Sequence, residues 1–138
     1  MNLTLEHVSG GTPVAVLSIH GDLDGSNFQD LIAKSRELYA AGTRRLLLDL
    51  SDMPYMSSAG LVALHSIALL LRGEEPPDPE DGWAAFHAVS RDQDRGVSPQ
   101  QNVKLLNPQS RVTRTLEMTG MNQFFPIYTD RAEAITSF

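Results

Sequence analysis

Two adjacent hydroxyls, Ser57 and Ser58, stand where a strand gives way to a helix. The apolar run over residues 46–50 predicts a strand that is covered on both faces. From residue 61 onward apolar residues recur at steps of three or four, which predicts a helix with Ser57 or Ser58 at its N-cap. A hydroxyl there lies near free backbone N–H groups and the positive end of the helix dipole, so this position tolerates a phosphate and presents it to a partner; the alternative is a helix cap with no regulatory role.

A second polar cluster, Asp22 and Asp24, follows an earlier strand. Its two alternative roles are to stabilise a tight turn and to meet a basic surface of a partner. Strands and helices alternate after this point, so we expect right-handed crossovers and parallel strands whose carboxyl ends meet at one edge of a sheet. Residues 22–25 and 56–60 are therefore expected to lie side by side.

A nucleophilic serine enzyme is the alternative from a different functional class. The Ser58-Ala59-Gly60 sequence contains part of a nucleophile elbow, but Met56 stands where that motif needs glycine. The histidines have no spacing that is typical of a catalytic base or a metal site; they are His7, His20, His65 and His87. We therefore expect a protein without catalytic residues, metal or cofactor.

The composition restricts the class of partner. The 138 residues include 11 basic and 17 acidic side chains, and this net charge of −6 argues against nucleic acid or an anionic membrane as the main partner. The chain contains no cysteine, and it shows neither a signal-peptide pattern nor an apolar run of about 18 residues. These observations predict a cytoplasmic, non-spanning protein of one domain that binds another protein.

The pattern of strands predicts an α/β domain that begins with a hairpin. Alternating residues around Leu3 and Leu5 form its first strand, Gly10-Gly11 its turn and residues 13–19 its second strand. Further strands are predicted at residues 46–50, 103–106 and 125–128.

Helix signals lie between these strands. Besides the helix from about Ser58 to Leu71, the sequence predicts three helices: one from a Ser26 or Asn27 cap to Gly42, one from a Ser110 cap to Met118 with Gly120 after it, and one opened by an Asp130–Glu133 capping box.

Residues 73–101 differ in composition from the rest of the chain. Three prolines and five carboxylates lie close together at its start, and they exclude a continuous helix and a buried strand. We expect an inserted loop. It is either tolerated at the surface, or it carries Trp83 and Phe86 as a contact for a partner or for a second copy of the chain in a homodimer.

The segment from Leu48 to Leu61 resembles the signature of STAS domains, in particular those of bacterial anti-sigma-factor antagonists. The matching residues are Asp49-Leu50-Ser51, Met53, Tyr55, Met56 and Ser58-Ala59-Gly60-Leu61, whereas Ser57 stands where the family usually has Asp. Two further stretches resemble the family in the right order: Val14 to Asp24, with its Gly-Asp-Leu-Asp ending, and Asn107 to Tyr128.

The resemblance implies a STAS fold, a mixed sheet of about four to five strands that starts with a hairpin and is covered by helices. The inserted loop at 73–101 has no counterpart in it. The resemblance assigns the phosphoacceptor to Ser58, with Ser57 as the alternative acceptor. The implied partner-binding residues are Asp22, Asp24, Ser26, Met56, Ser57, Ser58, Ala59, Gly60 and Leu61.

The same resemblance implies the partners. The unmodified chain would bind an anti-sigma factor and free the sigma factor. That anti-sigma factor would also be the serine kinase, of the histidine-kinase-like ATPase type, and a metal-dependent serine phosphatase would reverse the modification. The alternative is a STAS module of a lipid or anion transport system, or of a larger signalling assembly, that binds a partner or small ligand without a phosphoswitch.

Overall fold

Five strands form one mixed sheet in the order β1-β2-β3-β4-β5. The computed structural model describes residues 1–8, 12–76 and 102–138. β1 pairs antiparallel with β2, and every other neighbouring pair is parallel, so the predicted mixed sheet with an opening hairpin is confirmed. The strands are β1 (Asn2–Val8), β2 (Val14–His20), β3 (Leu46–Asp49), β4 (Val103–Leu106) and β5 (Ile127–Tyr128).

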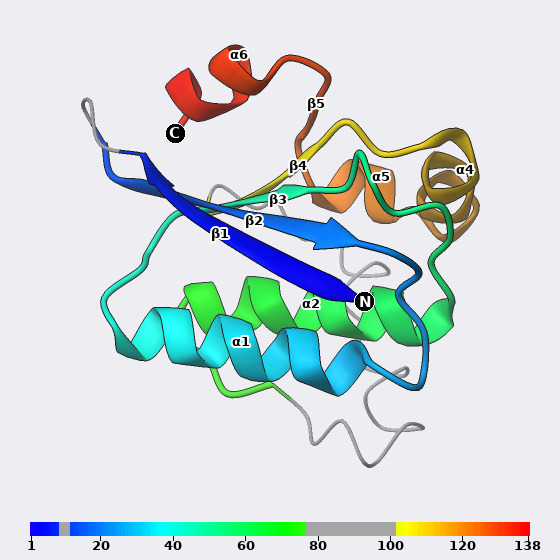
Figure 1. Ribbon diagram of the computed structural model, residues 1–138, viewed down its shortest axis with the longest axis horizontal. Helices are drawn as coiled ribbons and strands as arrows, with labels where there is room; N and C mark the ends of the chain where they lie inside the picture. Colours follow the sequence, from blue (N-terminus) through cyan, green and yellow to red (C-terminus); the bar gives the residue numbers. More distant parts are fainter. Residues whose placement is uncertain (9–11, 77–101) are drawn as a thin grey trace.

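Helices cover both faces of this sheet. Figure 1 shows α1 and α2 against one face and α6 against the other, with α4 and α5 near the carboxyl ends of the parallel strands. The helices are α1 (Phe28–Ala40), α2 (Ser58–Leu71), α4 (Ser110–Thr119), α5 (Met121–Phe124) and α6 (Arg131–Thr136). The predicted turn at Gly10-Gly11 and the predicted contacts of Trp83 and Phe86 lie outside the described residues.

The strands β2 and β3 are buried on both faces. Ala15, Leu17 and Ile19 of β2 belong to the larger core cluster, which also includes buried residues of α1 and α2. Val14 and Val16 belong to a smaller cluster with residues of β3, β4 and α6. A strand that is covered on both faces has a continuous run of apolar residues in the sequence. For this reason the sequence predicts β2 and β3 well.

One predicted N-cap residue is wrong, and two that are correctly placed make no side-chain cap hydrogen bond. The N-cap of α4 is Gln109, not Ser110, and α1 begins after Asn27, whose side chain makes no cap hydrogen bond to the helix. Ser57 is the N-cap of α2, but its hydroxyl makes no cap hydrogen bond either. The amide of Asn27 instead accepts from Asp24 N and donates to Asp22 O, because the preceding turn competes for it.

A side-chain cap begins α6, and a lysine of the sheet contacts its C-terminal end. Asp130 is the predicted N-cap, and its carboxylate accepts a hydrogen bond of 3.0 Å from Glu133 N. The buried Lys104 of β4 donates from Nζ to the backbone oxygen and the hydroxyl of Ser137, both at 2.9 Å. Its ammonium also lies 4.5 Å from the ring centroid of Phe138.

α5 is a turn of helix that the sequence does not predict. α4 ends at Gly120, which adopts the left-handed conformation with φ of 79° as predicted for a C-terminal glycine. The chain then forms one more helical turn, in which Met121 and Phe124 are buried. The last strand is accordingly shorter than the predicted residues 125–128 and contains Ile127 and Tyr128 alone.

Candidate functional site

The pairing of β2 with β3 continues beyond the ends of both strands. Leu23 N donates to Tyr55 O at 3.0 Å, Ser57 N donates to Leu23 O at 2.9 Å, and Leu23 and Met56 form a parallel β-bridge. The loop after β2 and the loop after β3 therefore lie side by side, as the sequence predicts. The two backbone hydrogen bonds that make up this bridge fix the position of each loop against the other.

The two candidate phosphoacceptors differ in accessibility. Ser58 is exposed and is the first residue of the 14-residue helix α2. The Oγ atom of Ser57 is buried and has no hydrogen-bond partner. Of the two hydroxyls, that of Ser57 is closed to a partner enzyme, and the residue that the resemblance selects is the open one.

Three of the predicted binding residues are buried beneath the surface of the two loops. Met56, Gly60 and Leu61 are all buried. A Cβ atom on Gly60 would lie 2.2 Å from Met56 Cγ and 3.2 Å from Leu23 Cδ2. These three residues support the exposed part of the two loops. The other predicted binding residues are exposed (Asp22, Ser26 and Ser58) or partly exposed (Asp24, Ser57 and Ala59).

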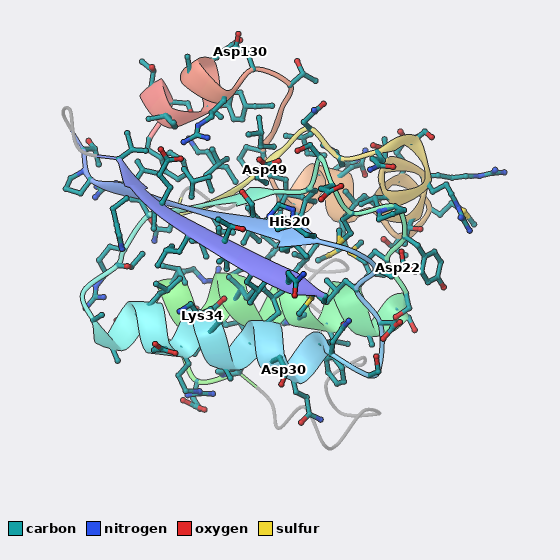
Figure 2. The ribbon with its side chains drawn as sticks, viewed as in Figure 1. His20, Asp22, Asp30, Lys34, Asp49 and Asp130 are labelled. Atoms are coloured by element: carbon teal, nitrogen blue, oxygen red, sulfur yellow. The ribbon has the colours of Figure 1, made fainter. Side chains whose placement is uncertain are left out.

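The acidic turn before α1 is stabilised by its own side chains. Asp24 Oδ1 accepts hydrogen bonds from Ser26 N at 2.9 Å and from Ser26 Oγ at 2.5 Å. Both bonds hold the pKa of Asp24 below its ordinary value of 3.8. Asp24 therefore stabilises the turn, which is one of the two roles that the sequence predicts for it. Asp22 is exposed and follows the end of β2 (Figure 2).

Ser26→Ala is expected to raise the pKa of Asp24, because the hydroxyl bond is the largest cause of its lowering. The folded pKa is the lower one, so this carboxylate stabilises the native state above pH 3.8 and the contribution is lost as the pH falls through the folded pKa. NMR titration of the Asp24 carboxyl carbon in both proteins measures the difference. Identical titration curves would contradict the proposed role of the hydroxyl.

A network that the sequence reasoning missed lies next to these loops. His20 Nδ1 lies 2.7 Å from Asp52 Oδ2, His20 Nε2 lies 2.8 Å from Thr4 Oγ1, and Gly21 N donates to Asp52 O at 3.0 Å. His20 thus links β1, the end of β2 and the loop that leads to Ser58. The strand register, with Asn2 opposite His20, is the signal that could have revealed it.

The hydroxyl, imidazole and carboxylate of this network have the order found in nucleophilic serine enzymes. They do not involve Ser58, whose side chain makes no hydrogen bond to the rest of the described structure. In the described ranges, moreover, no three His, Cys, Asp or Glu side chains are placed to hold a metal ion. None of the described helices has the length and apolar character that crossing a membrane requires.

A surface cavity of about 360 Å³ lies at the opposite end of the parallel strands. Its lining includes residues at the start of β2 and the connection from α1 to β3, among them Val14, Gly42 and Arg45. None of the residues at positions 22–26 or 56–61 lines it. The cavity is therefore separate from the loops that carry Ser58.

Comparison with known proteins gives a family match and a set of similar folds. A family model described as "Mlab, STAS domain" matches residues 7–76, just over half of the chain. A sequence comparison with curated proteins found no match.

Solved structures share the fold at low sequence identity. An anti-sigma factor antagonist from Mycobacterium paratuberculosis is 19% identical with a TM-score of 0.62, over 99% of this chain and 93% of that one. A Thermotoga maritima protein, provisionally assigned as an anti-sigma factor antagonist, is 18% identical with a TM-score of 0.67, over 97% and 92%. The Bacillus cell fate determinant SpoIIAA in its phosphorylated form is 16% identical with a TM-score of 0.57, over 98% and 97%.

Proposed function

This chain belongs to the STAS domain family, and from that membership we propose that it is an anti-sigma-factor antagonist controlled by phosphorylation of Ser58. The proposal treats the chain as one cytoplasmic STAS domain with an inserted segment at 73–101. The unmodified chain binds an anti-sigma factor that is also a serine kinase, and this binding frees the sigma factor. A serine phosphatase returns the phosphorylated chain to the binding form.

One observation carries the proposal: the exposed Ser58 begins α2 directly beside the acidic turn of Asp22 and Asp24. The start of a long helix accommodates the charge of a phosphate, so the fold tolerates the modification. Two proteins with this fold support it by analogy, the Mycobacterium antagonist and SpoIIAA, which has been solved in a phosphorylated form.

The chemistry of the switch follows from charge and volume. Phosphoserine adds about 1.5 to 2 negative charges and a bulky group to a surface that already carries Asp22 and Asp24. A partner surface that fits the neutral hydroxyl must then accommodate and desolvate the phosphate. The chain itself supplies a docking surface and an acceptor hydroxyl, and the partner supplies ATP and catalysis.

The family match also favours a second candidate. The description of the matching family model names Mlab and does not name an anti-sigma-factor antagonist. In addition, Ser57 stands where the antagonists usually have Asp. The second candidate is therefore a STAS module of a lipid or anion transport system, or of a larger signalling assembly, that uses the same loops without phosphorylation.

Isolation of the protein from its own cells separates the two candidates. We expect intact-mass spectrometry and peptide mapping to find phosphate on Ser58, and we expect a kinase of the histidine-kinase-like ATPase type among the copurified proteins. An unphosphorylated chain that copurifies with a transporter would contradict the antagonist and support the second candidate.

A further inference from the structure

The exposed face of α4 combines basic and apolar side chains with one carboxylate, that of Glu117. Val112 and Leu116 point into the core, while Arg111, Arg114 and Met118 recur at steps of three and four and form one exposed stripe. Met118 is 78% exposed, more than any other large hydrophobic residue of the described ranges. A methionine in that position covers no part of the chain's own core.

The two arginines of this stripe form no ion pair with any described carboxylate. Four other described cations are paired with carboxylates, in the pairs Lys34–Glu37, Arg36–Glu75, Arg72–Glu74 and Arg131–Glu6, whereas Arg44, Arg45 and Lys104 are not paired with a carboxylate of the described ranges. Neither Arg111 nor Arg114 has such a partner in the part of the chain that the structure describes, although the chain has an excess of acidic residues. Two unpaired cations on an acidic protein form a local surface that attracts negative charge.

This stripe is continuous with the loop that carries Ser58. The guanidinium of Arg111 lies 5.4 Å from the ring centroid of Tyr55, which is 39% exposed and belongs to that loop. Gln109 Nε2, just before α4, donates at 2.8 Å to Ser51 O in the same loop. Figure 1 shows α4 beside the connection from β3 to α2, so the stripe and the phosphoacceptor lie at the same end of the molecule.

We propose that Tyr55, Arg111, Arg114 and Met118, here called the α4 surface, form a second half of the partner-binding face and dock a segment of the partner that has carboxylates around an apolar side chain. Tyr, Arg and Met are enriched at the centres of protein interfaces. The inference rests on the proposed function for the identity of the partner.

The charges of the acidic turn and of the α4 surface also determine the orientation in which the partner binds. The turn with Asp22 and Asp24 is acidic and selects a basic surface, while the α4 surface is basic and selects an acidic one. The segment with Tyr55 and Ser58 pairs with the acidic turn through the backbone of Leu23, and it contacts the start of α4 through the ring of Tyr55 and the guanidinium of Arg111. Opposite poles admit one orientation of the partner and repel the reverse one.

Calorimetric titration against the purified kinase that copurifies with the wild-type chain tests the inference. Arg114→Glu is expected to weaken binding about tenfold, and Met118→Ala several-fold. Lys34→Glu is the matched control, because it makes the same charge change on α1, which Figure 2 shows away from α4. That control is expected to bind as the wild type does, and thermal melts of all variants verify that they fold.

The outcomes distinguish this inference from the proposed function. Weaker binding by Arg114→Glu and Met118→Ala, together with wild-type binding by Lys34→Glu, supports the α4 surface. Equal weakening by Arg114→Glu and Lys34→Glu overturns it, because only the net charge then matters. If Ser58→Asp weakens binding while both α4 variants bind normally, the α4 surface is wrong and the proposed function stands. If the α4 variants weaken binding and Ser58→Asp does not, the surface stands and the phosphoswitch fails.

Discussion

Phosphorylation of Ser58 is expected to weaken binding to the anti-sigma kinase about a hundredfold, or about 3 kcal/mol. Ser58→Asp carries a smaller charge and is expected to weaken it about tenfold. The free energy of unfolding is not expected to fall, because a carboxylate in the first turn of α2 interacts favourably with the helix dipole, by about 0.3 to 1 kcal/mol. Loss of affinity with retained stability is the signature of an effect confined to the binding face.

Calorimetry of the Ser58→Asp protein and urea denaturation of the same sample measure these two quantities together. Ser58→Ala is the matched control: it is expected to bind as the wild type does and to take up no phosphate from the kinase. Ser57→Ala is expected to be phosphorylated normally, because the Ser57 hydroxyl is buried. Phosphate incorporation into Ser58→Ala would assign the acceptor to another residue.

Gly60→Ala is expected to lower the free energy of unfolding by about 2 to 3 kcal/mol. The added Cβ would lie 2.2 Å from Met56 Cγ and 3.0 Å from its sulfur, in a place where Leu23 leaves no room on the other side. Met56 is 1% exposed and is bridged to Leu23 through the backbone, so its side chain cannot move to solvent without moving the loop. Urea denaturation measures the loss.

Gly25→Ala provides the control for this prediction. Gly25 lies in the neighbouring loop, and a Cβ there meets no atom within 4 Å. Its stability is expected to stay within about 1 kcal/mol of the wild type. A Gly60→Ala protein that unfolds at the wild-type urea concentration would show that the core yields to the extra methyl group.

The sequence predicts those features that follow from burial. The apolar runs of β2, β3 and β4 and the apolar spacing of α2 determine which faces turn inward, because the burial of apolar side chains drives folding more strongly than any other interaction. The side-by-side placement of residues 22–25 and 56–60 follows from parallel pairing alone. The exposed Ser58 also follows, because the helix period places it before the first buried residues of α2.

The features that the sequence does not predict depend on competition between polar groups. Asn27 is a good N-cap by type, yet its amide satisfies the turn at Asp22 and Asp24. His20 acquires its partners from β1 and from the loop after β3, which only the strand register brings together. Local propensity contains no information on which of several nearby donors and acceptors pair, so such contacts require the assembled fold.

The backbone ladder between Leu23, Tyr55 and Ser57 has a consequence for the speed of signalling. Because both loops are hydrogen-bonded to each other and to the sheet, the proposed phosphorylation of Ser58 requires no rearrangement of either loop. Under the proposed function, the signalling state would then be a phosphoester on an already formed surface, and it would last as long as that phosphoester does. The proposed kinase and phosphatase, and not a conformational change of this chain, would set the response time.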